Sequence, residues 1–463
     1  MQAKNNWLEA SVERPASETH VFADSILEER VCPLEACFPR ATQHFRRCES
    51  SQNAFNALLV VHLGELRTLK SILGTNIGDA ILQHIRNVLA MHALAENSVA
   101  SKSGDDEIII LLQKIGETHA AAVAGATAAS MQITRALDQF RIGSGYCRQG
   151  PISIGIAVFS DCGADNPLQQ ASLAMLHSKA IGTSAISHYN DEMLRAAVKK
   201  IELVADLQKA LSNREFRVAY QPQVDSNGNP IGAEALIRWM HPLKGEILPG
   251  EFIPCAENSG LIPSIGKWVL TEACEQLSRW AGNENFQHLS ISVNVSAIQL
   301  KNNDFISEVK SILKNTGANP CMLKLEITES FFISNTGSVA IGLRHLTSIG
   351  IKISMDDFGT GYASFSSLRL IPFNQIKIDR VFVTDILNSE VDSSIVNSII
   401  SLARTLKIEV MAEGVETIHQ FHALKKMGCR YFQGYFFTPP MNIDGLNSWI
   451  MNQTARLVPA ALP

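Results

Sequence analysis

The sequence contains no apolar run of about 18 residues, the length that crosses a bilayer, and its first residues lack the apolar core of a signal peptide. Its nine cysteines are scattered and form no CxxC pair, which argues against a disulfide framework and against a zinc site with four ligands. It has no HExxH motif and no basic stripe with interleaved aromatic residues. We therefore expect a cytoplasmic protein with no membrane segment and no nucleic acid partner.

Length and composition are those of an ordinary globular protein. The chain has 463 residues, of which 46% are hydrophobic, and its 40 basic and 45 acidic residues give a formal charge of -5. A mildly acidic protein has no overall field that attracts polyanions, so a partner that carries phosphate must be bound locally. At roughly 100–200 residues per domain, the length predicts two to four domains, unless one is a barrel of about 250 residues.

The pattern along the chain predicts five segments: a leader or poorly structured cap (1–50), a small α/β unit (51–189), a linker helix (190–212), a barrel (213–452) and a frayed tail (453–463). Prolines and weak periodicity mark the leader, whereas strand-like and helical runs alternate in the α/β unit. Apolar residues at helical spacing mark the linker, for which Asn190 or Asp191 is the expected helix cap.

Eight strand-like runs alternate with helical runs after the linker: FRVAYQPQV, IGAEALIRW, LSISVNVS, LKLEITES, IKISMDDF, QIKID, IEVMAEG and YFQGYFF. Eight strands with intervening helices in about 250 residues predict a (β/α)8 barrel of the TIM type. The expected fold class is therefore α/β, with a C-terminal TIM-like barrel after a smaller α/β domain.

Reactive groups in such barrels cluster at the C-terminal ends of the strands. Five of the seven strands after the first carry Asp or Glu within the strand or at its end. The polar residues in or near these strand ends are Glu234, Arg238, Asn294, Glu326, Glu329, Asp356, Asp357, Lys377, Asp379, Glu413, Glu416 and Gln433. A lone carboxylate on a strand is more often part of a structural salt bridge, but several on successive strands indicate a site that holds positive charge.

These residue types favour magnesium or manganese, because carboxylate and amide oxygens are ligands for hard divalent cations. Asp356 and Asp357 are adjacent, and neighbours on a regular strand point to opposite faces, so both reach one site only at a strand end. Two cations about 3.5–4 Å apart can clamp the attacking and leaving oxygens of a phosphoryl displacement. Lys377 adds a point charge for the water or the phosphate. The residues alone predict a metal-dependent phosphoester hydrolase.

Seven motifs in the barrel segment resemble those of the EAL-domain cyclic di-GMP phosphodiesterases. They are EALIRW, NVS, LEITES, MDDFGTGY, KID, AEGVE and QGYFFTPP, and they run in this order from Glu234 to Pro440. The similarity covers about residues 200–452. It implies a bacterial signalling enzyme that hydrolyses cyclic di-GMP to linear pGpG with two Mg²⁺ or Mn²⁺ ions per site, and a homodimer formed through the barrel.

The resemblance also implies a role for each matching residue. The expected metal ligands are Glu234, Asn294, Glu326, Asp356, Asp357 and Glu413. Three residues are expected to act on the attacking water or on the DFGTGY loop: Lys377, Glu413 and Glu329. We place five further residues at the substrate: Gln221, Arg238, Asp379, Glu416 and Gln433.

The first α/β unit resembles a GGDEF diguanylate cyclase domain that has lost its key residues. The segment Gly104-Asp105-Asp106-Glu107-Ile108 stands where the family has GGDEF, so an aspartate replaces the second glycine. His62 stands where the family places a metal aspartate, Gly64 at the second such aspartate, and Lys70 and Ser71 replace an Asn-Asp pair. We expect no cyclase activity, and either a scaffold role or a residual GTP site that regulates the barrel.

Two other functions stay open at this point. One is a cyclic di-GMP receptor whose intact site binds the nucleotide without significant turnover. The other is a barrel enzyme that acts on an unrelated phosphoester.

Overall fold

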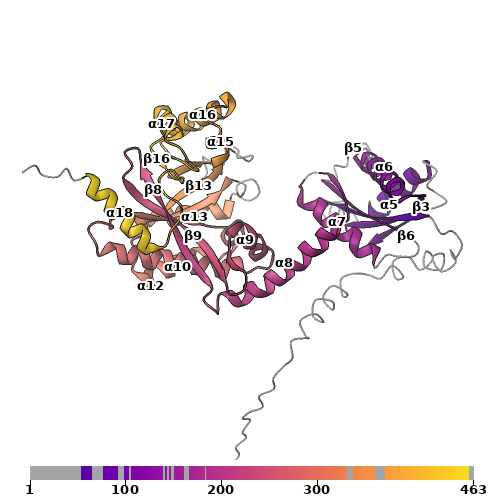
Figure 1. Ribbon diagram of the computed structural model, residues 1–463, viewed down its shortest axis with the longest axis horizontal. Helices are drawn as coiled ribbons and strands as arrows, with labels where there is room; N and C mark the ends of the chain where they lie inside the picture. Colours follow the sequence, from indigo (N-terminus) through magenta and orange to yellow (C-terminus); the bar gives the residue numbers. More distant parts are fainter. Residues whose placement is uncertain are drawn as a thin grey trace, which may run out of the picture. The chain divides into compact units, whose positions relative to one another are not determined.

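The computed structural model describes residues 54–64, 77–91, 98–103, 106–138, 141–142, 145–146, 151–160, 166–182, 184–329, 331, 337–359 and 371–457. The chain divides into two compact units, residues 1–202 and residues 203–463, each described here by itself (Figure 1). The expected leader lies outside the described residues. So do Gly104, Asp105, Lys70 and Ser71, and the part of the DFGTGY loop after Gly359.

The first unit is a five-stranded sheet covered by helices on both faces. Its strands, in spatial order, are β2 (Ser98–Ser103), β3 (Glu107–Gly116), β1 (Phe55–Leu63), β6 (Ile152–Ser160) and β7 (Ala185–His188). Its longer helices are α5 (Ile77–Met91), α6 (His119–Asp138) and α7 (Pro167–Ala180). Two short strands, β4 (Arg141–Ile142) and β5 (Gly145–Tyr146), pair with each other in antiparallel fashion. Strand β1 alternates its side chains between the two faces: Leu59 packs with α5 and α6, whereas Leu58 packs with α7.

Helix α8 (Asp191–Ala210) occupies the segment in which we predicted a connecting helix. The side chain of Asn190 accepts a hydrogen bond from the backbone N–H of Met193 at 3.1 Å, as a helix cap does. The last turns of the helix bury Leu203, Leu207 and Ala210 in the core of the second unit.

The second unit is a closed eight-stranded barrel, which confirms the predicted fold class. Its strands, in spatial order, are β9 (Pro230–His241), β11 (Ser290–Asn294), β12 (Leu323–Thr328), β13 (Lys352–Phe358), β14 (Gln375–Ile378), β15 (Glu409–Ala412), β16 (Tyr431–Phe432) and β8 (Phe216–Asp225), and β8 also pairs with β9. A short strand, β10 (Gly245–Ile247), extends β9 at the outside.

Helices connect most barrel strands and pack around them (Figure 1). They are α9 (Pro249–Asn258), α10 (Ile262–Ala281), α11 (Ala297–Lys301), α12 (Phe305–Thr316), α13 (Gly337–Ser348), α15 (Arg380–Thr384), α16 (Glu390–Leu406), α17 (Ile418–Met427) and α18 (Ile443–Leu457). Helix α18 continues to Leu457, into the segment that we expected to fray, because its apolar residues keep their helical spacing and Ile450 is buried. None of the helices that the structure describes combines the length and the apolar character of a membrane span.

The expectation of a helix between every pair of barrel strands is wrong at the first pair. Strand β8 runs antiparallel to both β9 and β16, and a turn joins β8 directly to β9. A parallel crossover needs about a dozen residues or more, and here only Ser226–Asn229 connect the two strands. Asp225 accepts hydrogen bonds from the backbone of Asn227 and Asn229, and Gly228 has a φ of 85° that other residues seldom adopt.

An aromatic cluster closes the outer core beside the β8–β9 hairpin. The rings of Phe216, Trp239, Phe252 and Trp268 pack in tilted and edge-to-face arrangements, with centroids 5.7–6.1 Å apart. Trp239 is fully buried, and its indole N–H donates to Glu215 at 2.9 Å. The interior of the barrel, by contrast, is lined by buried polar side chains, and these form the candidate site.

We predict that Trp239→Ala lowers the free energy of unfolding of the barrel by about 3–5 kcal/mol, because it leaves a large cavity and removes the donor to Glu215 Oε2. Urea denaturation followed by far-ultraviolet circular dichroism measures the change. Leu243→Ala is the matched control, since Leu243 is 91% exposed and its truncation should cost no more than about 0.5 kcal/mol. Equal effects of the two substitutions would contradict this account of the core.

Candidate active site

The site lies inside one end of the barrel, where parallel pairing aligns the carboxyl ends of the strands. Asn294 ends β11 and pairs with Glu326 on β12, and Asp356 on β13 pairs with Thr328 on β12. Glu413 and Gln433 directly follow β15 and β16, respectively. Strand register therefore brings together residues that are far apart in the sequence.

A buried lysine occupies the centre of the site. The ammonium of Lys377 lies 2.6 Å from Glu326 Oε2, 3.2 Å from Asp356 Oδ1 and 3.7 Å from Glu234 Oε2, and it also contacts Glu413. Burial lowers the pKa of Lys377, but the four carboxylates outweigh this effect and hold the pKa well above its ordinary value. Lys377 is therefore a permanent cation without exposure to solvent.

Amide groups position Glu234 on β9. Asn294 Nδ2 donates to Glu234 Oε1 at 2.6 Å, and Gln433 Nε2 donates to Glu234 Oε2 at 2.5 Å. Gln433 Nε2 also donates to Gln221 Oε1 at 3.1 Å. Burial raises the pKa of Glu234, but Lys377 and the amide donors prevail, so the net shift is downward and Glu234 is held as a carboxylate.

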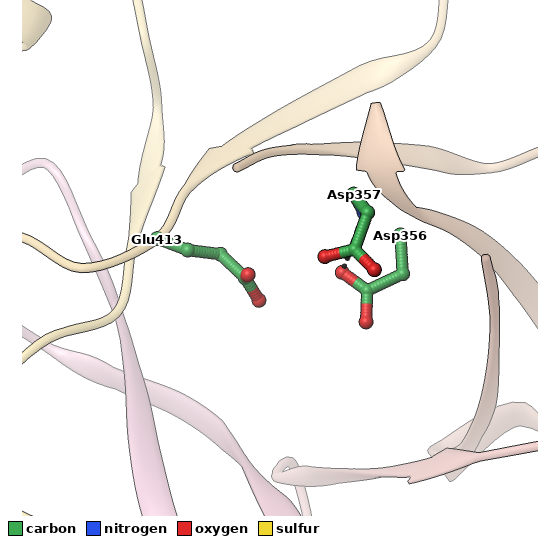
Figure 2. Close-up of side chains that lie close together, drawn as sticks. All are labelled: Asp356, Asp357 and Glu413. Carbon is green, nitrogen blue, oxygen red and sulfur yellow. Dashed lines mark hydrogen bonds between the residues drawn. The ribbon is translucent and has the colours of Figure 1, made fainter. Parts of the chain in front are cut away.

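Asp356 and Asp357 reach the same site because the strand bulges at these two residues, between Met355 and Phe358. Pairing with β14 shifts register after Met355, and Asp357 has a φ of 54°, in the left-handed region. Carboxylate oxygens of Asp356, Asp357 and Glu413 lie within 4.8 Å of one another, and the three side chains face a common space (Figure 2). The sequence argument placed both aspartates at a strand end, and the bulge is the feature that turns them together.

Three carboxylates of the cluster have raised pKa values in the metal-free protein. Burial is the largest cause for each, and neighbouring carboxylates add to it: the pKa of Glu326 rises to about 7, that of Asp357 to about 7, and that of Glu413 well above its ordinary value. Glu326 Oε1 is buried and has no hydrogen-bond donor among the described residues.

The donor set fits divalent cations. When all are ionised, the five carboxylates of the cluster and the ammonium of Lys377 have a net charge of -4. The carboxylates are those of Glu234, Glu326, Asp356, Asp357 and Glu413. Carboxylate oxygens, one amide and an unpartnered buried oxygen are the ligands that Mg²⁺ and Mn²⁺ prefer.

Of the four other predicted residues, Glu329 and Asp379 contact the segment of the two aspartates, whereas Arg238 and Glu416 have other surroundings. Glu329 Oε2 accepts from the backbone N–H of Gly359 at 2.7 Å and so ties the start of the DFGTGY loop to β12. Asp379 caps α15 by accepting a hydrogen bond from the backbone N–H of Val381, and its side chain is also hydrogen-bonded to that of Asp357. Arg238 pairs with Glu246 on β10 at 3.2 Å, and Glu416 is exposed just before α17.

The structure adds buried polar residues that sequence reasoning missed. Five such residues are at most 4% exposed: Gln223, Ser292, Lys324, Ser354 and Gln375. Each stands two residues from a predicted one on the same strand, so it points to the same face: Gln221, Asn294, Glu326, Asp356 and Lys377, respectively. The period of two along a strand was the signal that could have found them.

The site of the first unit has a different character. His62 Nε2 lies 3.0 Å from the ammonium of Lys179 on α7 and 3.7 Å from Asp106 Oδ2. Burial and the charge of Lys179 lower the pKa of His62, so the imidazole is neutral. A lysine thus lies beside the position at which the resemblance places a metal aspartate.

Family models match both units. A model described as EAL domain matches residues 204–440, and one described as diguanylate cyclase, GGDEF domain, matches residues 36–185. The chain is 34% identical over 393 residues to the bifunctional diguanylate cyclase/cyclic di-GMP phosphodiesterase MucR of Pseudomonas aeruginosa, covering 84% of the chain and 56% of MucR. It is 31% identical over 401 residues to the cyclic di-GMP phosphodiesterase PdeR of Escherichia coli, covering 86% of the chain and 59% of PdeR. The chain thus spans little more than half the length of these curated relatives.

Solved structures agree with the family models. The PaMucR phosphodiesterase in its c-di-GMP complex is 41% identical, with a TM-score of 0.51, and covers 53% of this chain and 99% of its own. The EAL enzyme Bd1971 in its cGMP-bound form is 26% identical, with a TM-score of 0.54, and covers 74% of this chain and 81% of its own.

We predict that the metal-free protein loses stability as pH rises from about 5 to 8. A carboxyl group whose pKa is higher in the folded than in the unfolded chain stabilises the fold below the unfolded pKa, and this contribution is lost as pH rises through the folded pKa. Glu326, raised from 4.5 to about 7, accounts for part of the loss, so Glu326→Gln should flatten the pH dependence by roughly 2–3 kcal/mol.

Urea unfolding in EDTA at pH 5 and pH 8 measures this difference. Glu284→Gln, at an exposed position, serves as the control and should follow the unmodified protein. If Glu326→Gln also follows the unmodified protein, Glu326 does not hold the proton that we assign to it.

Proposed function

The chain belongs to the EAL-domain family, with a GGDEF domain in tandem, and from this premise we propose that it is a phosphodiesterase that hydrolyses cyclic di-GMP to linear pGpG. The observation that carries the proposal is the ammonium of Lys377 among four carboxylates from separate strands, at the carboxyl end of the barrel. The likeness to PaMucR, a phosphodiesterase with c-di-GMP bound, supports the choice of substrate.

We propose that two Mg²⁺ or Mn²⁺ ions bind in this cluster. Glu234, Asn294, Glu326 and Asp356 would hold one, and Asp357 and Glu413 the other. Such cations, when bound, neutralise the carboxylates and the phosphate and make a water molecule more acidic.

The residues of the chain then supply position and proton transfer. Lys377 donates hydrogen bonds toward the attacking water or a phosphate oxygen, because its carboxylate partners hold its ammonium in place. Glu413, whose carboxylate contacts the ammonium of Lys377 within the cluster, takes the proton of the water as the oxygen attacks phosphorus. The P–O3′ bond breaks, the released 3′ oxygen takes up a proton from solvent, Glu413 returns its own proton to solvent, and the product is linear pGpG.

The surrounding residues would fix this geometry and bind the substrate. Glu329 holds the backbone of Gly359 next to the aspartate pair. The proposed contacts to the substrate remain Gln221, Arg238, Asp379, Glu416 and Gln433. The family resemblance also supports a homodimer through the barrel.

We propose that the first unit does not synthesise cyclic di-GMP. His62 is neutral and lies beside the ammonium of Lys179, and this pair would repel a divalent cation that a metal aspartate would attract. The unit would act as a scaffold, and a residual GTP site is the weaker option.

We predict that the protein converts cyclic di-GMP to pGpG with Mg²⁺ or Mn²⁺, and that Glu234→Ala lowers kcat/KM by at least about 100-fold. Loss of a residue that only supports a metal ligand costs 10–100-fold, so loss of a ligand should cost at least as much. Chromatography of the nucleotides measures turnover, and Glu284→Ala is the control. Binding without product would favour the receptor function, and neither binding nor product would favour another phosphoester. Full turnover by Glu234→Ala would reject the cation site.

We further predict that the protein makes no cyclic di-GMP from GTP with Mg²⁺. The experiment uses Glu234→Ala, in which hydrolysis cannot remove the product, and follows radiolabelled GTP by thin-layer chromatography. Labelled cyclic di-GMP above the level of a protein-free blank would show that the first unit is an active cyclase despite His62.

A further inference from the structure

Gln223 is a buried amide with no part in the proposed chemistry. It lies on β8, its side chain is fully buried, and it faces the barrel interior two residues after Gln221. Its Nε2 donates to Gln433 Oε1 at 2.9 Å, and its Oε1 accepts from the hydroxyl of Ser292 at 3.4 Å. A polar side chain at such a position is costly unless its hydrogen bonds are made, so these two contacts define its environment.

The direction of these hydrogen bonds follows from Glu234. An ionised carboxylate only accepts hydrogen bonds, so Gln433 must turn its NH₂ group toward Glu234 Oε2, 2.5 Å away. The carbonyl oxygen of Gln433 then faces Gln223, which must present its own NH₂ group. The carbonyl of Gln223 is left for Ser292, whose hydroxyl can donate. One orientation of each amide satisfies the whole chain.

We propose that Gln223 is a positioning residue that fixes the amide of Gln433, and through it the carboxylate of Glu234, in the orientation that receives a cation. The inference rests on the proposed function in one respect, since it takes Glu234 as a cation ligand. Ser292 completes the chain and holds Gln223 from β11.

Two substitutions of Gln223 disturb this chain in different ways. Gln223→Met keeps the volume but removes the donor, so the buried carbonyl of Gln433 loses its partner. Gln223→Glu keeps the shape but turns an oxygen toward the carbonyl of Gln433. The amide of Gln433 is then driven to flip, which points its carbonyl at the carboxylate of Glu234.

Calorimetric titration of the full chain with Mn²⁺, without nucleotide, tests the proposal. We expect Gln223→Met and Gln223→Glu to weaken Mn²⁺ binding by 10–100-fold, the usual effect of losing a residue that orients a metal ligand. Gln276→Met is the matched control, because Gln276 on α10 is 3% exposed and bonds to Arg279 outside the barrel interior. Its Mn²⁺ affinity should be unchanged.

The double variant Gln223→Met/Gln433→Met separates positioning from general packing. If Gln223 acts only through Gln433, the double variant binds Mn²⁺ as Gln433→Met does. Losses that add, or single variants of Gln223 with affinity within twofold of the unmodified protein, would overturn the proposal.

A measurement without metal tests the positioning role of Gln223 independently of the proposed function. Hydrogen exchange of the side-chain NH₂ of Gln433, followed by NMR, should be slow in the unmodified protein and faster in Gln223→Glu. The NH₂ of Gln420, which is buried and donates to the carbonyls of Val383 and Thr384, should stay protected in both. If the protein binds no Mn²⁺ at all, the proposed function fails, and unchanged protection of Gln433 then rejects the positioning role as well.

Discussion

The contact on which the site depends is that of one buried ammonium with four carboxylates. Lys377 contacts Glu234, Glu326, Asp356 and Glu413, which come from separate strands of the barrel. Without it the carboxylates would repel one another in a low-dielectric interior. With it they still carry excess negative charge, which appears in the metal-free protein as raised pKa values of Glu326 and Glu413. The barrel is therefore built to receive further positive charge.

A layer of buried polar groups supports these charges from below. Gln223 and Ser292 lie beneath Gln433 and Asn294, and Ser354 and Lys324 both donate to Gln375 Oε1. Burying such polar groups costs free energy unless their hydrogen bonds are made. The hydrogen bonds that they make fix the orientation of the groups above them. The first unit shows a contrasting case, in which the ammonium of Lys179 lies beside a neutral His62 and offsets part of the charge of Asp106 and Glu107.

Much of this could be predicted from the sequence, because strand ends in a barrel share one face. That rule, with the carboxylates, predicted the convergence of Glu234, Glu326, Asp356, Lys377 and Glu413. The antiparallel β8 was missed, although four residues are too few for a crossover. The bulge at Asp357 depends on pairing with β14, and the direction of the Gln223–Gln433 bond depends on Glu234 across the barrel. The conformational preferences of the individual residues predict neither the bulge nor the direction of this hydrogen bond.

The central claim is that this cluster binds two divalent cations beside the substrate. Anomalous diffraction from crystals grown with Mn²⁺ and cyclic di-GMP tests it most directly. The account requires two manganese peaks among Glu234, Asn294, Glu326, Asp356, Asp357 and Glu413, next to a phosphate of the nucleotide. Nucleotide bound at the barrel mouth with no manganese peak among these residues would contradict it.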